Sequence, residues 1–268
     1  MLKVEDLSFS YYGTPVFKGV SFEVKEGELC GLFGPNGSGK TTLFKCCLNF
    51  LRPSTGCVTI DGIRSKSRKI EEMAKIVSYV PQEHRPPFPY LVKEVVMMGR
   101  TPHLGGVFGI SRDDKKKVAD ALELLEIPHL ADKPYSQLSG GQRQLVLIAR
   151  AVAQETKLML LDEPTSALDF SNQIRIWRLL KKISAQGTTI LACSHDPNHI
   201  SWFCTDVVVM SGGSVAAKGD PKAVITEQLM DRIYNNVCSV GSLNQLKMVF
   251  PKGLQEFNNG GVICDGNL

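Results

Sequence analysis

Short runs of β-branched and aromatic residues open the chain and are separated by turn signals. The runs cover residues 2–8, 16–24 and 29–33. They predict a small β region at the N-terminus. After residue 33 the pattern changes to a glycine-rich loop followed by a helix, and this helix is expected to stop near Leu51 because Pro53 cannot continue it.

The rest of the chain alternates between apolar runs and amphipathic stretches. Strands are predicted at residues 76–80, 158–161, 188–193 and 207–210, and helices at residues 113–125, 140–154, 171–185, 197–203 and 226–234. A segment rich in Pro and Gly, residues 81–109, precedes the first two of these helices, so we expect a mainly helical insert. Strands that alternate with helices are typical of a parallel sheet with crossover helices, and the core is therefore predicted to be α/β.

Composition and charge narrow the classes of function. The 268 residues suffice for one large domain or two tightly associated ones. The 31 basic and 27 acidic residues give a net charge of +4 and are interspersed, so no nucleic-acid partner is expected. Eight cysteines, two of them adjacent, favour reduced thiols over a disulfide framework, and the five histidines show no zinc-binding spacing.

The start of the chain and its apolar runs bear on localisation. A strand-like stretch stands where a signal peptide would show a basic end and an apolar run. Nowhere do 18 consecutive apolar residues occur, as a membrane-spanning helix would require. We therefore expect a cytosolic protein that reaches a membrane only through a partner.

One glycine-rich segment predicts a phosphate-binding loop. It reads Gly34, Pro35, Asn36, Gly37, Ser38, Gly39, Lys40 and Thr41, and it matches G-x-x-x-x-G-K-[ST] between a strand and a helix. Glycines let successive backbone N–H groups turn toward phosphate oxygens, and the helix N-terminus adds a positive dipole end. We expect Lys40 to reach the β- and γ-phosphates and Thr41 to ligate Mg2+. A dinucleotide site is disfavoured, because Thr42 stands where G-x-G-x-x-G requires its third glycine.

Two acids follow the apolar run at residues 158–161. A buried strand of a parallel sheet delivers such carboxylates to the edge at which phosphate loops open. We expect Asp162 to hold Mg2+ through its water shell, and Glu163 to orient and deprotonate the attacking water as general base. Taken alone, the pair is equally compatible with exposed acids at a strand end, and it gains weight from the phosphate loop.

A second helix start with exposed backbone N–H groups is predicted at Ser139, Gly140, Gly141 and Gln142. Ser139 is well placed as the N-cap, and the two glycines leave the first turn open to a ligand. The pattern would suit a second phosphate-binding terminus. On these residues alone, however, an ordinary Ser-capped helix is the favoured interpretation.

The order of four segments resembles the ATP-binding subunits of ABC transporters, over about residues 1–220. The segments are GPNGSGKTT at residues 34–42, LSGGQ at 138–142, LLDEPTSALD at 160–169, and Ser194-His195-Asp196. The resemblance implies a P-loop NTPase core with an N-terminal antiparallel β subdomain and an α-helical subdomain inserted at about residues 84–154. It also implies a helical or irregular tail at 221–268 that packs on the domain, and binding and hydrolysis of ATP with Mg2+.

The resemblance assigns further site residues. Gln82 corresponds to the Q-loop glutamine that touches Mg2+ and connects to the membrane partner. Tyr12 corresponds to the aromatic residue that stacks on adenine, with Tyr11 as the second candidate. Residues 166–169 correspond to the D-loop, which ends at Asp169, and His195 to the switch histidine at the γ-phosphate. Without the resemblance these would be read as a core aromatic, a turn residue and a solvated histidine.

The resemblance also implies partners. Two subunits meet head to tail, so that residues 139–142 of one copy close over ATP on residues 34–42 of the other and add N–H donors to the γ-phosphate. A groove near residues 82–109 would transmit the motion to transmembrane permease subunits at the cytoplasmic face of the membrane. An extracytoplasmic substrate-binding protein is expected to act on the permease. Lys40, Glu163 and His195, the expected catalytic residues, are all present, which argues against an inactive module.

Three further segments resemble the importers of metal chelates, which carry iron-siderophore complexes, haem or cobalamin. They are Met98-Gly99-Arg100-Thr101-Pro102-His103, GQRQ at residues 141–144 and AQET at residues 153–156. The alternatives are the energiser of an exporter and a soluble ABC-type ATPase of translation or DNA repair. Members of the translation type usually carry two cassettes, and the 122 positions from Lys40 to Asp162 leave no room for the coiled coils of the repair type.

Overall fold

The computed structural model of the chain describes residues 1–82, 89–104, 109–166, 168–244 and 246–253. The expected start of the helical insert, at about residue 84, lies outside these ranges. So do Ala167 of the expected D-loop and the last fifteen residues of the expected tail.

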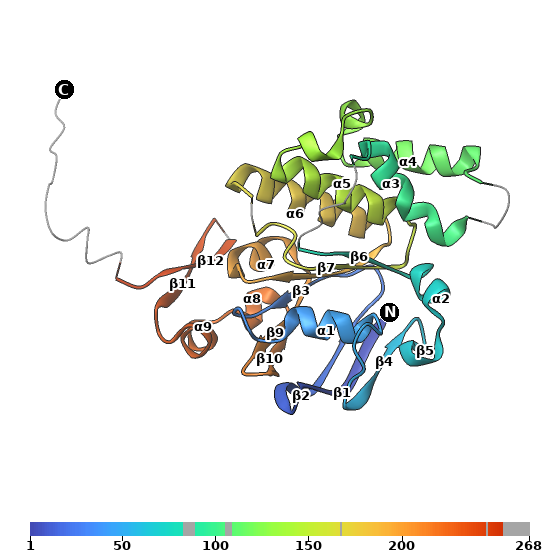
Figure 1. Cartoon of the computed structure of the whole chain (residues 1–268). Coiled ribbons are helices and arrows are strands. Elements are labelled where there is room, and N and C mark those ends of the chain that lie inside the picture. The colour runs from blue at the N-terminus through green and yellow to red at the C-terminus, as the bar shows by residue number, and fades with distance from the viewer. Residues whose placement is uncertain (83–88, 105–108, 167, 245, 254–268) are drawn as a thin grey trace, which may run out of the picture.

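A six-stranded sheet forms the centre of the molecule (Figure 1). Its strands, in spatial order, are β10 (Ser214–Gly219), β9 (Asp206–Ser211), β3 (Leu29–Phe33), β8 (Thr189–Ser194), β7 (Leu158–Leu161) and β6 (Val77–Val80). The strands from β9 to β6 are parallel, and β10 pairs with β9 in the antiparallel direction. Every residue of β3, β7 and β8 is buried, as expected for parallel strands covered on both faces. The predicted α/β core is confirmed.

An antiparallel sheet packs on one face of this core and contains the N-terminal strands. In spatial order it runs β2 (Thr14–Val24), β1 (Leu2–Tyr11), β4 (Thr55–Ile60) and β5 (Ile63–Arg64). Buried and exposed residues alternate along β1 and β2, as expected of strands with only one face on a core. The buried side chains meet α1 (Lys40–Cys47), which crosses between the two sheets. β4 and β5 were not predicted, because their residues are mostly exposed or only partly buried and give little apolar pattern.

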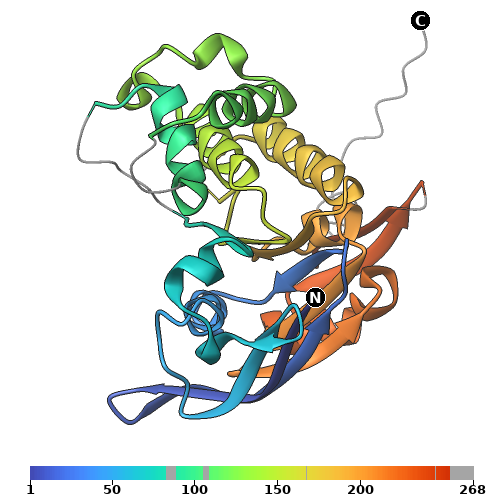
Figure 2. The ribbon, with the colours of Figure 1, turned by 90° about the vertical axis from the view of Figure 1, so that its right-hand side faces the viewer.

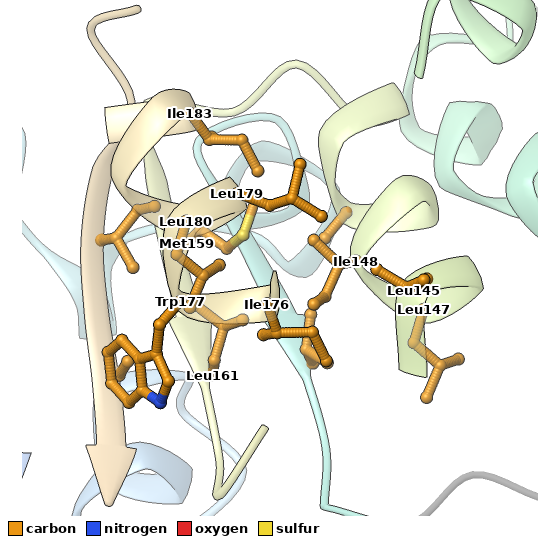
Figure 3. Packing of buried hydrophobic residues seen from close by; sticks show 14 of the residues in the cluster. Leu145, Leu147, Ile148, Met159, Leu161, Ile176, Trp177, Leu179, Leu180 and Ile183 are labelled. Carbon is orange, nitrogen blue, oxygen red and sulfur yellow. The ribbon is translucent and has the colours of Figure 1, made fainter. Parts of the chain in front are cut away.

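A group of helices covers the other face of the central sheet (Figures 1 and 2). Its members are α3 (Val92–Met97), α4 (Arg112–Leu124), α5 (Gly140–Ala153) and α6 (Phe170–Ala185). Of two shorter helices, α2 (Ile70–Ala74) contacts β6, and α7 (Pro197–Phe203) packs against β3 and β8 next to α6. Ile148 of α5 and Trp177 of α6 pack with Met159 and Leu161 of β7, as Figure 3 shows.

The tail contains more regular structure than the sequence analysis predicted. It comprises α8 (Pro221–Val224), α9 (Glu227–Tyr234), β11 (Cys238–Leu243) and β12 (Leu246–Pro251). The last two form an antiparallel hairpin, where only irregular chain was expected. The hairpin escaped prediction because most of its residues are only partly buried, so its apolar alternation is weak. Ile225 and Met230 are completely buried in the same core as Trp177.

No helix of the described ranges is both long and apolar enough to cross a lipid bilayer.

Arg100 ties three segments of the helical layer together. Its Nε donates to Asp114 Oδ1 at 3.0 Å, and its Nη1 donates to the Ala153 carbonyl and to Glu155 Oε2, both at 2.8 Å. Arg100 and Asp114 are both buried. Hydrogen bonds from Ser111 and from Arg100 lower the pKa of Asp114 to about 2. The carboxylate is therefore charged in the folded protein and depends on these donors.

We predict that Arg100→Met lowers the free energy of unfolding by about 3 kcal/mol, because it leaves the charged Asp114 without its buried partner. Urea titration measures the effect. Lys116→Met is the matched control, since it breaks an exposed pair with Asp120 (3.4 Å) and should cost less than about 0.5 kcal/mol. Equal shifts of the two midpoints would show that the Arg100 network is not a stabilising junction.

Candidate functional site

Three strands end at one edge of the central sheet and deliver the phosphate loop, Glu163 and His195 to a single cleft. Phe33 of β3 is in register with Ser194 of β8, and Leu161 of β7 with Ala192 of β8. The segments that follow these strands therefore emerge side by side. The cleft between them measures about 400 Å³ and is lined by Tyr11, Val16, Asn36, Gly37, Ser38, Gly39, Lys40, Thr41, Thr42, Gln82, Glu163 and His195.

The glycine-rich loop needs its glycines for two reasons. Gly37 (φ 81°) and Gly39 (φ 98°) adopt left-handed backbone conformations, which side chains strongly disfavour. A Cβ on Gly34 would lie 2.3 Å from the Met210 carbonyl oxygen, so the loop can pack on β9 only with glycine there. No side chain caps α1, and its positive N-terminal end faces the loop. Together these features form a cradle for a polyanion.

Lys40 and Glu163 meet behind the loop. Lys40 is 6% exposed, and its Nζ donates to the carbonyl oxygens of Gly34 (2.7 Å) and Pro35 (3.2 Å). The same Nζ lies 3.5 Å from Glu163 Oε1. On the other side of this carboxylate, His195 Nδ1 lies 2.7 Å from Glu163 Oε2. Glu163 is thus held between a cationic side chain and a histidine at the mouth of the cleft.

The backbone of Glu163 supports this placement. Its φ of 49° is in the left-handed region, which costs a residue with a side chain on the order of 1 kcal/mol or more. Asp162 still belongs to the strand ladder, because its N–H donates to the Val80 carbonyl at 2.9 Å. The left-handed backbone of Glu163 then turns the Glu163 side chain in another direction, so the two acids face different surroundings.

Asp162 is the buried member of the acid pair. It is 2% exposed, and the Tyr79 hydroxyl donates to its Oδ2 at 3.4 Å. Burial raises the pKa of Asp162, and hydrogen bonding from the Thr41 hydroxyl opposes that shift. Within the described residues, its buried Oδ1 has no hydrogen-bond partner. A carboxylate oxygen of this kind, close to a hydroxyl, suits a hard cation that prefers oxygen ligands.

A metal ion held entirely by protein side chains has less support. The part of the chain that the structure describes contains no group of three or more His, Cys, Asp or Glu residues that could enclose such an ion. Mg2+ does not need such a group, because it keeps several of its waters and takes only one or two protein carboxylates beside phosphate oxygens. The oxygens of Asp162, Thr41 and Gln82 fit that mode of binding.

Gln82 connects the cleft to the turn after Glu163. Its Nε2 donates to Ser166 Oγ at 3.3 Å, and this hydroxyl donates to the Glu163 carbonyl at 3.2 Å. The exposed Gln82 thereby touches the chain that carries the acid. Gln82 also lines the cleft, so it joins the cleft to this turn.

Residues 139–142 lie at the start of α5, in the helical layer. Ser139 Oγ accepts from Gln142 N–H (3.3 Å), and Gln142 Oε1 accepts from Ser139 N–H (3.0 Å), so the two form a capping box at the start of α5. A Cβ on Gly141 would lie 3.1 Å from Asn172, which bonds to Asp169, the N-cap of α6. Neither residues 139–142 nor Asp169 belong to the described lining of the cleft.

The two tyrosines are placed differently by the β1–β2 turn. Tyr11 pairs with Thr14, which leaves Tyr12 and Gly13 as a two-residue turn with positive φ at both positions (48° and 86°). Tyr12 is fully exposed and does not line the cleft, whereas Tyr11 does. The structure therefore favours Tyr11, the second candidate, over Tyr12 as the aromatic residue of the site.

Two residues near the site were not identified from the sequence. Tyr79 precedes Gln82 by three positions, and its ring packs against Phe44 and Phe50 at centroid distances of 6.5 and 6.4 Å. It looked like one more apolar strand residue. Val16 lines the cleft beside Tyr11 and likewise carries no chemical signal of its own.

The sequence is similar to a known protein family. Residues 17–166, more than half of the chain, match the family described as ABC transporter. The ferric enterobactin transport ATP-binding protein FepC of Escherichia coli K12 is 35% identical over 240 residues, which cover 89% of each chain. The hemin import ATP-binding protein HmuV of Rhizobium meliloti is 34% identical over 265 residues, covering 94% of this chain and 98% of HmuV.

Solved structures show the same similarity. A metal-chelate type ABC transporter in an inward-facing conformation superposes with a TM-score of 0.81 at 30% identity, covering 93% of this chain and 96% of that chain. The dimeric, post-hydrolysis state of the ATP-binding cassette MJ0796, bound to ADP and Pi, superposes with a TM-score of 0.71 at 29% identity. That match covers 82% of this chain and 99% of that cassette.

Proposed function

The chain belongs to the ABC transporter family, and from this membership we propose that it is the ATP-hydrolysing subunit of an importer of metal chelates. The main support for ATP hydrolysis is the position of Glu163. Its carboxylate lies between Lys40 and His195 in the cleft behind the phosphate loop. The import of metal chelates rests on the similarity to FepC, to HmuV and to the metal-chelate type transporter.

The loop and Lys40 bind the triphosphate in this proposal. Backbone N–H groups of residues 34–42 and the positive end of α1 face the phosphate oxygens, and Lys40 leaves the loop carbonyls to reach the β- and γ-phosphates. Thr41, Asp162 and Gln82 would hold Mg2+. When bound, Mg2+ neutralises the charge that builds up on the phosphate oxygens during transfer.

Glu163 then acts as the general base. Its carboxylate accepts a proton from the attacking water, and His195 Nδ1 steadies the carboxylate at 2.7 Å while the ring faces the γ-phosphate. Lys40, on the other side, keeps positive charge beside the reacting oxygens. The three side chains divide the work between proton transfer, orientation and charge.

The second half of the site comes from a second copy of the chain. ABC cassettes form dimers, as the MJ0796 structure illustrates. We propose that Ser139, Gly140, Gly141 and Gln142 of the partner close over ATP, together with the region of Asp169. The open start of α5, where Ser139 and Gln142 form a capping box, is compatible with that arrangement. The N-terminus of α5 would add donors to the γ-phosphate only in the closed dimer.

ABC import ATPases work with permease subunits, and we propose a groove near the cleft as the docking surface. Residues 83–88 and 105–108 of the expected groove lie outside the described ranges. The described chain offers a groove of about 770 Å³ between the end of α1, β4 and α2, whose lining includes Phe50, Ile70, Tyr79 and Gln154. Two large apolar side chains of this groove face the solvent, Phe50 at 64% and Ile70 at 84% exposure, and they offer a partner an apolar contact.

Docking there would place the chain on the cytoplasmic face of the membrane, held by the permease. An extracytoplasmic substrate-binding protein would deliver the chelate to that permease. No nucleic-acid partner is needed, since the charges are interspersed. An exporter subunit or a soluble ATPase of translation or repair is the alternative.

Glu163→Gln should keep ATP binding and reduce kcat about 10²–10⁴-fold, because the amide cannot take the proton of the attacking water. Steady-state ATPase assays and nucleotide titration measure the two quantities. Glu126→Gln, a change of the same kind at an exposed carboxylate outside the cleft, should leave both unchanged. Undiminished turnover of the Glu163 variant would remove it from the role of base.

Tyr11→Ala should weaken ATP binding roughly tenfold, the usual order for losing a base-stacking contact. Tyr12→Ala should change it less than about twofold, because Tyr12 projects from the turn. Inorganic tripolyphosphate, which has no base, should bind the unmodified chain and both variants equally in calorimetric titration. If only Tyr12→Ala weakened ATP binding, Tyr12 would be the stacking residue, as first predicted.

Phe50→Glu should abolish co-purification with the permease from native membranes and leave the ATPase activity of the purified chain within about twofold. Leu243→Glu is the matched control, since Leu243 is 62% exposed on the tail hairpin. The recovered complex should transport a ferric siderophore or haem in vesicles. Recovery of ribosomes or of DNA-repair proteins instead would refute the transporter proposal.

A further inference from the structure

The tail reaches the loop that carries His195. Tyr234, the last residue of α9, donates its hydroxyl hydrogen to the His195 carbonyl oxygen at 2.9 Å. Its ring lies 6.2 Å from that of Phe33, the residue just before the phosphate loop. Burial raises the pKa of Tyr234 to about 12, so the hydroxyl keeps the proton it donates at any working pH.

The hairpin holds the other end of the same loop. Asn198 lies in the first turn of α7, three residues after His195. Its Oδ1 accepts from Val249 N–H at 2.8 Å, and its Nδ2 donates to the Val249 carbonyl at 3.0 Å. A side chain that pairs with both backbone groups of one β12 residue fixes α7 in distance and in orientation.

The tail is itself anchored to the core. Lys252, which follows β12, bonds both carboxylate oxygens of Asp231 on α9, at 2.8 and 3.0 Å. Met230 of α9 and Ile225 are completely buried in the core beneath the helical layer. The hairpin and α9 are therefore joined to each other and to the sheet, which lets them hold a loop in place.

His195 needs such support. Its side chain is 49% exposed, so packing around the ring does not determine where it points. The chain before it is fixed by β8, whose last residue, Ser194, is in register with Phe33. The chain after it leaves the sheet. Asp196 holds this segment locally, by donating its N–H to Ser194 Oγ and capping α7, and the bonds from Tyr234 and to Val249 add the constraint that comes from the tail.

We propose that Tyr234 is a positioning residue for His195, and that α9 together with the paired strands β11 and β12 braces the loop so that the imidazole stays on Glu163. The proposal rests on the function assigned to His195 above. It makes the tail a part of the hydrolytic machinery of this chain, acting through the backbone of His195 and not through contact with nucleotide. A purely structural tail would instead affect stability and leave turnover per folded molecule unchanged.

Tyr234→Phe tests this with the ring kept in place. In the full-length chain, alone and in the co-purified permease complex, kcat for ATP should fall about five- to tenfold, with KM within about twofold. In the His195→Ala background the same change should have no further effect on kcat, because the residue it positions is gone. Thermal melting of each variant reports folding separately.

Trp202→Phe is the matched control. It removes a hydrogen bond of the same kind and length, from Trp202 Nε1 to the Lys247 carbonyl at 2.9 Å, that joins α7 to β12 without reaching His195. We expect a lower melting temperature and kcat within about twofold of the unmodified chain. A loss of kcat equal to that of Tyr234→Phe would assign both effects to loosening of the hairpin and overturn the specific role of Tyr234.

The outcomes separate this inference from the function on which it rests. If His195→Ala turns over ATP normally, the role of His195 fails. If His195→Ala is impaired but Tyr234→Phe is not, or if their effects multiply in the double variant, the positioning role fails and the proposed function stands. Should Tyr234→Phe not fold, Asn198→Asp keeps the acceptor for Val249 N–H and loses the donor. It should lower kcat only when His195 is present, and unchanged kcat would overturn the inference.

Discussion

The parallel pairing of β3, β8 and β7 is the constraint on which the site depends. Side chains alternate between the two faces of a strand, so a slip of one residue between β7 and β8 would turn Asp162 away from Thr41 and Tyr79. The complete burial of all three strands makes such a slip costly, since it would move apolar side chains to the wrong core. The apolar core thus determines the relative positions of the charged groups.

The cleft combines a buried half with an exposed half. Lys40 and Asp162 are almost inaccessible to water, and charge interactions there are stronger than at the surface because the local dielectric constant is lower. Gln82 and Ser166 are exposed, and their side chains are held by one and two hydrogen bonds respectively. Groups that must rearrange when a partner closes over the site belong in such weakly held positions, whereas groups that grip phosphate do not.

The sequence predicted the chemistry of the site better than its geometry. The phosphate loop, the acid pair and the order of the four segments are local patterns, and the structure brings the loop, Glu163 and His195 to one cleft. Tyr12 could not be separated from Tyr11, because only the strand register shows that Tyr12 occupies the turn. The roles of Tyr234 and Asn198 could not be foreseen either, since their partners are backbone atoms of His195 and Val249, far away in the chain.

The helical layer links the two elements that a second copy would use. Gly141 at the start of α5 packs against Asn172, and Asn172 bonds through both its backbone and its side chain to Asp169, which caps α6. A Cβ on Gly141 would lie 3.1 Å from the Asn172 side chain, so the close approach of α5 to α6 would have to loosen slightly with any other residue there. The two helix starts therefore pack directly against each other. Ser166 of the adjoining turn also bonds to Gln82 and to the Glu163 carbonyl, so hydrogen bonds connect this region to the backbone of the base in the same chain.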